Sequence, residues 1–299
     1  MASILTHTLL NWLLADENPA IKYRALTEIS GENPDVHKDC YDEIWKQKQI
    51  AKLLSCRNED GLLATKGKHG LEPMDNLEVF AEFGLHKDAR LDKNAQYSLD
   101  VIRTWKVKDT DLYACYTPSR LRALVMLGYC DNNVKTLIDE FAATQLSDGG
   151  FMCNRLLYKK PYRKSCYKAA VPGLLLYVEC KRKNMLPSNA DKLVDYFLRR
   201  EVFYTSDMAE NLFFHIDGVS PKFSKFGVPL MVYALSVLGV GDSPKMQKAW
   251  KLLYERLNEN GRLRLDGSSK QPGVYGKDGQ ENKWATFYAM LADKYRIAK

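Results

Sequence analysis

The chain has 299 residues, of which 45% are hydrophobic, and it carries a formal net charge of +7. This length fits one large domain or two ordinary ones, and this composition is ample for a buried core. The strongest apolar run lies near Val171–Val178. It is far shorter than the roughly twenty residues that a membrane-spanning helix needs, so no transmembrane segment is expected.

The N-terminal sequence does not resemble a secretory signal peptide. Met1–His7 lacks a basic region, and Asn11 and Asp16 interrupt the apolar stretch that follows. We therefore expect a cytoplasmic protein whose seven cysteines are reduced thiols or metal ligands. Lysine and arginine are scattered apart from one group at Lys159–Lys168, and no zinc-finger or recognition-helix pattern occurs, so we expect no nucleic-acid partner.

Helical periodicity dominates the chain from its beginning. It starts at Leu5–Leu13 and restarts at Asn18–Pro19, where asparagine and proline mark the start of a helix that runs to Ile29. An amphipathic segment covers Val36–Leu54, and the glycine-rich stretch Gly61–Glu72 is expected to be a loop. Further helices are expected at Met74–Gly84, Lys93–Trp105, Pro118–Cys130, Asn133–Thr144, Ser165–Cys180, Asn189–Phe203, Gly227–Val240, Pro244–Leu257 and Lys283–Tyr295. No segment alternates with a period of two, so the sequence predicts an all-α fold.

One pattern recurs along the chain: a helix that ends in an apolar residue and glycine, a second helix, and an acidic turn with glycine. In one copy Leu127–Tyr129 is followed by the turn Gln145–Phe151. In another, Leu238–Val240 is followed at similar spacing by Asn258–Leu263, and the turn alone recurs at Asn58–Leu62. Recurrence at this period predicts stacked helical hairpins, because one hairpin cannot bury its apolar face alone.

The expected helices are of two kinds. Those at Pro118–Cys130, Cys166–Cys180 and Pro229–Val240 are apolar on nearly all sides, as buried helices are. The helices between them, such as Asn133–Thr144 and Pro244–Leu257, are amphipathic. This alternation predicts an inner ring of helices enclosed by an outer ring.

At this point the motifs resemble a known superfamily. The runs Cys115–Tyr129 and Gln145–Cys153 resemble the glutamine–aspartate–glycine–glycine–aromatic repeats of terpenoid cyclases and protein prenyltransferases. Asn18–Tyr23 and Gly261–Leu265, with the aromatic helix from Lys283, look like the corresponding segments of uncharacterised bacterial squalene-cyclase-like proteins. The resemblance implies an α/α-toroid whose inner helices surround an apolar cavity.

The expected domain organisation is a single globular unit, since no glycine–serine linker divides the chain. Residues 1–60 are expected to form a helical cap continuous with a toroid at residues 61–299.

Two acidic motifs of the superfamily are missing from the sequence. The nearest run to the Asp-x-Asp-Asp motif of proton-initiated cyclases is Asp109–Leu112, which leaves Asp111 as the candidate catalytic acid. The Asp-Asp-x-x-Asp run that holds magnesium diphosphate does not occur.

Three cysteines are expected at equivalent points of the ring. Cys115 precedes one buried helix, Cys166 opens the next, and Cys153 follows the acidic turn between them. Helix N-termini favour thiolates, and three thiolates with a fourth ligand suit tetrahedral zinc, for which His215 and Asp111 are candidates. The resemblance implies the same rim, where protein prenyltransferases hold a catalytic zinc with an aspartate, a cysteine and a histidine. The alternative is that these cysteines, like the remaining four, pack as small apolar groups.

The expected substrate is an isoprenoid or a similar apolar molecule, such as a prenyl diphosphate. Arg163 and Lys164 lie beside Cys166 and would face its anionic end, where charge develops as diphosphate leaves. The apolar part would be lined by Tyr116, Tyr167 and Trp284. The sequence thus favours a zinc-dependent enzyme of the prenyltransferase or terpenoid cyclase type. A non-catalytic lipid-binding protein and a helical scaffold remain alternatives.

Overall fold

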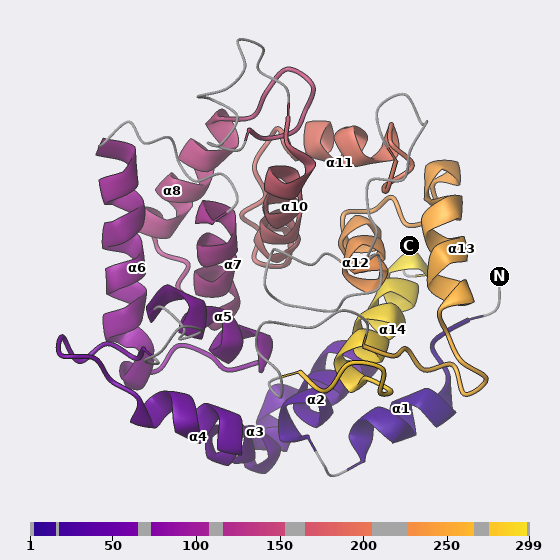
Figure 1. Cartoon of the computed structure of the whole chain (residues 1–299), viewed down its shortest axis with the longest axis horizontal. Coiled ribbons are helices and arrows are strands. Elements are labelled where there is room, and N and C mark those ends of the chain that lie inside the picture. Colours follow the sequence, from indigo (N-terminus) through magenta and orange to yellow (C-terminus); the bar gives the residue numbers. More distant parts are fainter. Residues whose placement is uncertain are drawn as a thin grey trace. The chain divides into compact units, whose positions relative to one another are not determined.

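The computed structural model describes residues 3–15, 18–64, 73–107, 116–152, 165–204, 227–265 and 275–297. Within these ranges the regular secondary structure is helical, and pairing between extended segments is limited to the isolated bridges Arg57–Leu63 and Arg264–Glu281. The predicted all-α class is confirmed. The described residues form two compact units, which are coloured along the sequence in Figure 1. Unit 1 holds those up to residue 47 and from residue 197 on, and unit 2 holds those from 48 to 196.

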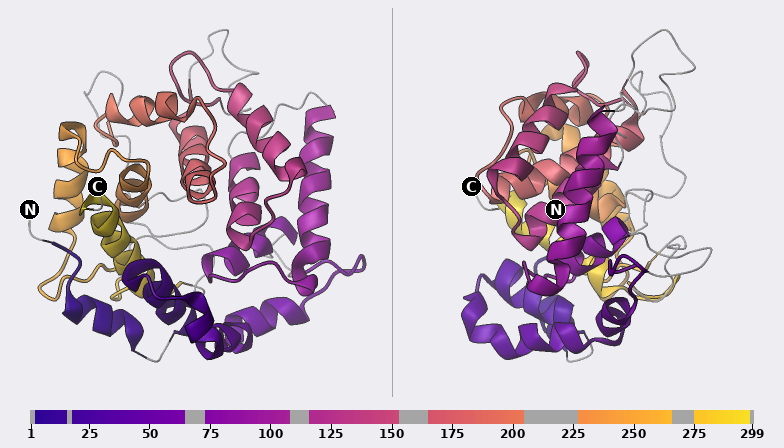
Figure 2. Two further views of the ribbon diagram at one scale, coloured as in Figure 1. Left: turned by 180° about the vertical axis from the view of Figure 1, so that it is seen from behind. Right: turned by 90° about the vertical axis from the view of Figure 1, so that its left-hand side faces the viewer.

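Unit 1 combines the beginning and the end of the chain. Its core is the pair α12 and α14, which lie side by side, and α14 also packs on α2 and the π-helical turn η1 (Figure 2). The elements of unit 1 are α1 (His7–Leu14), α2 (Pro19–Arg24), η1 (Ala25–Ser30), the 3-10 turn η2 (Pro34–His37), α3 (Lys38–Lys46), α12 (Val228–Val237), the 3-10 turn η3 (Pro244–Met246), α13 (Gln247–Glu255) and α14 (Lys283–Ile297).

The first described residues are anchored to the last helix by Asp293, which is fully buried on α14. Its Oδ2 accepts hydrogen bonds from the Ser3 hydroxyl at 2.6 Å and from the amide of Ile4 at 2.7 Å. Its Oδ1 is 2.6 Å from the guanidinium of Arg296. A buried carboxylate that is hydrogen-bonded on both oxygens thus ties the two ends of the described chain together in unit 1.

Unit 2 consists of α4 (Lys48–Ser55), α5 (Pro73–Glu82), α6 (Ala89–Val107), α7 (Thr117–Leu127), α8 (Asn132–Ala143), α10 (Tyr167–Arg182) and α11 (Ala190–Leu198), of which α11 reaches two residues into unit 1. Helix α7 packs against both α5 and α10. Every residue of α7 but one is buried, and so are thirteen of the fourteen residues from Tyr167 to Cys180 on α10, the exception being Lys168. The prediction that these helices are enclosed is confirmed.

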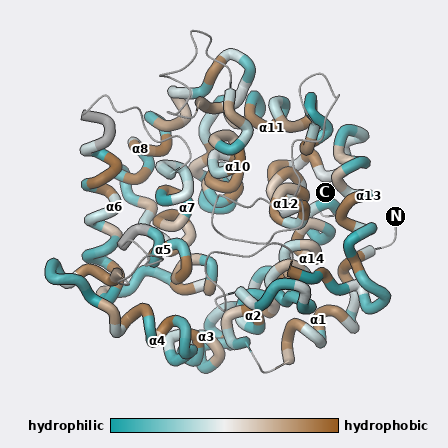
Figure 3. Tube along the Cα trace, viewed as in Figure 1, coloured by the Kyte–Doolittle hydropathy of each residue, from teal (hydrophilic) through white to brown (hydrophobic). Residues whose placement is uncertain are grey.

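The predicted contrast between apolar and amphipathic helices is also found in unit 1. All ten residues of α12 are buried, whereas α13 buries only Ala249, Trp250 and Leu253. Figure 3 shows the same contrast between α12, which is mostly hydrophobic in colour, and α3, which alternates along its turns. Among the described helices, none is both long enough and apolar enough to cross a membrane.

The helices expected from the sequence are found, although the one predicted at Asn189–Phe203 ends at Leu198 and the one predicted at Lys93–Trp105 begins at Ala89. A larger difference lies in the N-terminal region. The amphipathic segment predicted at Val36–Leu54 is not one helix, because Gln47 separates α3 from α4. Gln47 adopts an extended conformation with ψ 136°, and its side-chain amide donates a hydrogen bond to Asn18 Oδ1 at 3.2 Å. The capping residue of α2 therefore fixes the break between the next two helices.

The repeated glycines end helices as the sequence pattern predicts. Gly128 and Gly239 have φ values of 92° and 97°, and the following amides bond back to Leu124 and Leu235. This left-handed C-terminal geometry favours glycine because it carries no Cβ. Gly31 ends η1 with a left-handed φ of 75° as well.

The three acidic turns share one backbone geometry. In each, the residue three positions before the glycine accepts a hydrogen bond from the glycine amide and donates one to the carbonyl of the residue after the glycine. The glycines are Gly61, Gly149 and Gly261, with φ of 70°, 87° and 72°. The hairpin repeat is thus structural as well as sequential. Closure of the hairpins into a toroid, the cap at 1–60 and the single globular unit stay predictions.

Candidate functional site

Most residues predicted for the site lie outside the described part of the chain. They are Asp111, Cys115, Cys153, Arg163, Lys164 and His215. The others lie at the starts of buried helices. Tyr116 precedes α7, Cys166 precedes α10, Tyr167 is the first residue of α10, and Trp284 is the second residue of α14. The first three belong to unit 2 and Trp284 belongs to unit 1.

Within unit 2, α7 and α10 pack together. Arg122, five residues after the start of α7, lies 3.9 Å from Glu179, which is twelve residues after the start of α10.

Of the predicted zinc ligands, Cys166 lies in the described part of the chain. Its residue is half-buried and its amide donates to the Phe151 carbonyl at 2.8 Å. Among the described side chains, no three histidine, cysteine, aspartate or glutamate residues are grouped as a metal site would require. Zinc and its four ligands stay predictions. Cys180 is fully buried, and burial raises the pKa of its thiol to about 12, as the packing alternative expects for this residue.

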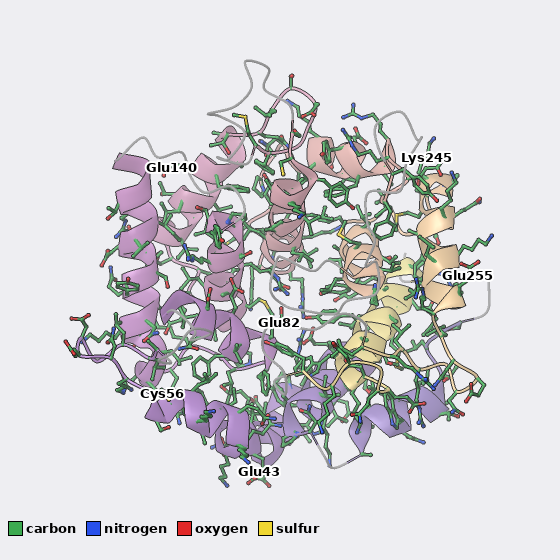
Figure 4. The ribbon with its side chains drawn as sticks, viewed as in Figure 1. Glu43, Cys56, Glu82, Glu140, Lys245 and Glu255 are labelled. Carbon is green, nitrogen blue, oxygen red and sulfur yellow. The ribbon has the colours of Figure 1, made fainter. Side chains whose placement is uncertain are left out.

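Unit 2 contains a buried ionic cluster that the sequence pattern did not reveal. Arg122 lies 2.5 Å from Glu82 on α5 and 3.9 Å from Glu179 on α10, and Glu179 is also 3.4 Å from Arg182. Figure 4 labels Glu82 on α5. Burial lowers the pKa of Arg120 nearby, against the opposing charges of Glu78 and Asp75. Because these acids and bases neutralise one another, the cluster is suited to joining three helices.

Unit 1 contains a pocket of about 360 Å³. It is formed where the first turn of α12, the end of α13 and the segment after the third acidic turn meet. Its apolar lining is Val228, Pro229, Leu253, Leu257, Leu263 and Leu265, and its polar lining is Glu255, Arg256, Asn258, Arg264 and Gly279. This volume falls within the range of roughly 300–1,000 Å³ that is typical of ligand pockets.

The wall beyond the turn is held in place by backbone pairing. Leu265 donates its amide to Gln280 at 3.0 Å and accepts a hydrogen bond from Gly279 at 2.7 Å. Arg262 and Glu281 clamp the same two segments through a 2.7 Å ion pair. The apolar side chains of Leu263 and Leu265 are thereby buried beside the pocket.

The pocket carries a positive balance of charge. Arg256 and Arg264 are both exposed at its edge. The nearby carboxylate of Glu255, labelled in Figure 4, lies 3.7 Å from Lys251. Glu281 has its pKa lowered chiefly by the hydrogen bond from Arg262, so it stays ionised and paired.

The first turn of α12 adds to this positive character. The helix begins after Gly227, which has no side chain to cap its amides. The N-terminal end of the helix, which is the positive end of its dipole, lies at the pocket because Val228 and Pro229 line it. The site residues predicted from the sequence include neither Arg256 nor Arg264, which flank the repeated turn Asn258–Leu263. Their proximity to a repeated turn at the end of a hairpin was the one available indication.

Comparisons with known proteins give little beyond the helical class. No family model matches the sequence, and no curated protein matches it. Among solved structures, the chain is similar to a protein described as glycosyl hydrolase family 88 from Bacteroides vulgatus, with a TM-score of 0.46 and 13% identity. That match covers 97% of this chain and 90% of the other. At this level of likeness no residue role is transferred.

Proposed function

We propose that the protein binds an isoprenoid diphosphate in the pocket of unit 1 and acts on it as an enzyme of the prenyltransferase or terpenoid cyclase type. One observation carries the proposal: an apolar floor and two arginines line the same pocket. A prenyl chain matches the floor of Leu253, Leu263 and Leu265. The diphosphate matches the edge, where Arg256 and Arg264 supply guanidinium groups.

The chemistry of such a ligand explains why the arginines would matter. Ionisation of a prenyl diphosphate breaks the bond between carbon and oxygen and leaves negative charge on the departing diphosphate. Positive groups that are fixed where this charge develops lower the barrier more than they strengthen ground-state binding. Arg256, at the end of α13, and Arg264, beyond the turn, would act on this charge from two separate elements.

The residues predicted from the motifs carry a separate part of the proposal, which does not depend on the pocket of unit 1. Aromatic rings at Tyr116, Tyr167 and Trp284 would stabilise a carbocation, and a zinc ion with Cys166 among its ligands would activate an acceptor thiol. Elemental analysis of the purified protein, with titration of its thiols, tests the zinc-dependent form. About one zinc per chain, lost on Cys166→Ser, supports it; a metal-free protein would remove zinc from the proposal.

Binding is tested by calorimetric titration with farnesyl diphosphate. Arg256→Gln and Arg264→Gln should each raise Kd by about two- to fivefold, because interactions of exposed charges are worth roughly 0.4–1 kcal/mol each. The double variant should raise Kd about tenfold. Leu257→Trp, at a half-buried position of the lining, should block binding by filling the pocket.

The matched control is Arg90→Gln, which removes an exposed arginine that pairs with Asp88 in unit 2. It should leave Kd unchanged. Equal loss in Arg90→Gln and Arg264→Gln would mean that only net charge matters, and the pocket would not be the site. Release of pyrophosphate from the bound ligand separates the enzyme from the alternative of a lipid-binding protein, which would bind without turnover.

A further inference from the structure

Helix α1 packs against the repeated turn Asn258–Leu263, which lies between the two pocket arginines. A Cβ added to Gly261 would lie 3.2 Å from Cδ1 of Leu9, so this leucine is in direct contact with the turn. Leu9 is itself 3% exposed. Trp12 follows three residues later and therefore lies on the same side of α1.

The ring of Trp12 lies against the guanidinium of Arg262, the residue after Gly261. Cζ of Arg262 is 4.5 Å from the ring centroid, within the roughly 6 Å over which an aromatic face attracts a cation. Nζ of Lys283 is 5.7 Å from the same centroid and donates to the carbonyl of Ala15 at 3.1 Å. Trp12 is therefore attracted by one cation on the turn and by another at the start of α14.

From Arg262 a continuous series of polar contacts leads to the pocket. Its Nη1 lies 2.7 Å from Oε2 of Glu281, and Oε1 of Glu281 accepts a hydrogen bond from the side-chain amide of Asn258 at 2.7 Å. Asn258 Oδ1 accepts a hydrogen bond from the backbone amide of Arg262 at 2.9 Å. Asn258 lines the pocket, whereas Arg262 does not. Glu281 thus holds both ends of the turn at once.

The turn connects the two arginines of the pocket. Arg256 lies two residues before Asn258, and Arg264 lies two residues after Arg262. Both side chains are exposed at the edge of the pocket, so the direction in which they point depends on the backbone that carries them. A backbone that is held in place before an anion arrives reduces the ordering cost of binding.

We propose that Trp12 is a positioning residue for the pocket of unit 1. By holding Arg262 outside the lining, it fixes the turn from which Arg256 and Arg264 reach an anionic head group. The part played by these two arginines rests on the proposed function, whereas the hold of Trp12 on the turn does not. Trp12 does not line the pocket and acts through Arg262 and Glu281.

Hydrogen exchange of the unliganded protein tests the hold of Trp12 on the turn. The amides of Gly261 and Leu265 donate to backbone carbonyls, and their exchange reports local opening. Trp12→Leu keeps an apolar side chain but loses the ring, and it should speed both exchange rates about two- to fivefold, as expected for one lost cation–π contact. Trp12→Phe should restore most of the protection. The amide of Gly149, in the matching turn of unit 2, should not change.

A double variant separates the cation–π contact from general packing. Arg262→Met keeps the apolar stem but loses the guanidinium, so it should speed exchange at least as much as Trp12→Leu. Adding Trp12→Leu to Arg262→Met should change the exchange rates little further, because the same contact can be lost only once. Fully additive effects of the two substitutions would overturn the action of Trp12 through Arg262.

The effect on the pocket is measured by calorimetric titration. Trp12→Leu should raise Kd for farnesyl diphosphate about two- to fivefold and leave Kd for farnesol unchanged, because it acts on the groups that meet the head group. The control is Trp45→Leu, which removes a half-buried tryptophan from α3 of the same unit and should change neither value.

The outcomes distinguish the two proposals. Unchanged exchange at Gly261 and Leu265 in Trp12→Leu would overturn the positioning role whatever the pocket binds, and so would an equal loss of affinity for farnesol. Wild-type protein that binds neither ligand would instead refute the proposed function, and the exchange rates would still decide whether Trp12 holds the turn.

Discussion

At the scale of single residues, the most consequential side chain in unit 2 is Arg122. Its side chain is 7% exposed, and its partners Glu82 and Glu179 are 2% and 5% exposed. Charges this deeply buried are tolerated only when paired. The sequence pattern predicts that α7 is buried and apolar but not that it carries buried ion pairs, because the carboxylates that neutralise Arg122 come from α5 and α10, distant in sequence.

Arg122→Ala should therefore destabilise the protein by about 3–5 kcal/mol, since it leaves buried carboxylates without their cation. Urea denaturation followed by circular dichroism measures the loss. Arg90→Ala, at the exposed pair with Asp88, is the control and should cost about 0–1 kcal/mol. Equal effects of the two variants would show that the cluster does not hold α5, α7 and α10 together.

Burial also makes a prediction for Cys180. Its pKa, raised to about 12 by burial, lies above the value of about 8.5 for a free thiol, so the folded state holds the proton more tightly. The contribution of the protonated Cys180 thiol to the free energy of unfolding is therefore fully present below pH 8.5 and is lost as the pH rises towards 12. In native protein at pH 8, Cys180 should resist a thiol reagent, while the half-buried Cys56 reacts. Mass spectrometry of labelled peptides locates the label; rapid labelling of Cys180 would contradict its burial.

At the scale of elements, much of the fold could be predicted because the deciding features are local. Helix periodicity, the caps at Asn18 and Asp131, and the left-handed glycines all act within a few residues of sequence. The hairpin of α10 and α11 does not show the glycine pattern in the sequence, because Asn184 (φ 56°) takes the place of glycine after α10. The break at Gln47 depends on a contact with Asn18, which no local pattern shows.

The glycines of the repeat should not be equally sensitive to substitution. At Gly128 an added Cβ meets nothing within 4 Å. Gly128→Ala should therefore lower the free energy of unfolding only through the strain of its left-handed backbone, by about 1–2 kcal/mol. At Gly149 the same atom overlaps the backbone oxygen of Lys192. Gly149→Ala should cost more than about 3 kcal/mol, since strain and overpacking add. Thermal denaturation of both variants measures the difference, and equal losses would contradict the close approach of the acidic turn to α11.

At the scale of the whole molecule, the repeated hairpins and the helical class follow from the sequence, whereas the pockets do not. A pocket forms where segments far apart in the chain meet, and the pocket of unit 1 joins α12, the end of α13 and the segment around Gly279. The motif-based site residues Tyr116 and Tyr167 are in unit 2, while Trp284 is in unit 1. Their joint role in one cavity therefore remains a prediction of the superfamily resemblance.

The proposed function depends most directly on how the protein discriminates between two ligands with the same chain. Calorimetric titration of the wild-type protein with farnesyl diphosphate and with farnesol isolates the contribution of the head group. The account predicts that the diphosphate binds at least tenfold more tightly, and that the difference disappears in the Arg256→Gln, Arg264→Gln double variant. Equal binding of the two ligands, or a preference that survives in the double variant, would contradict it.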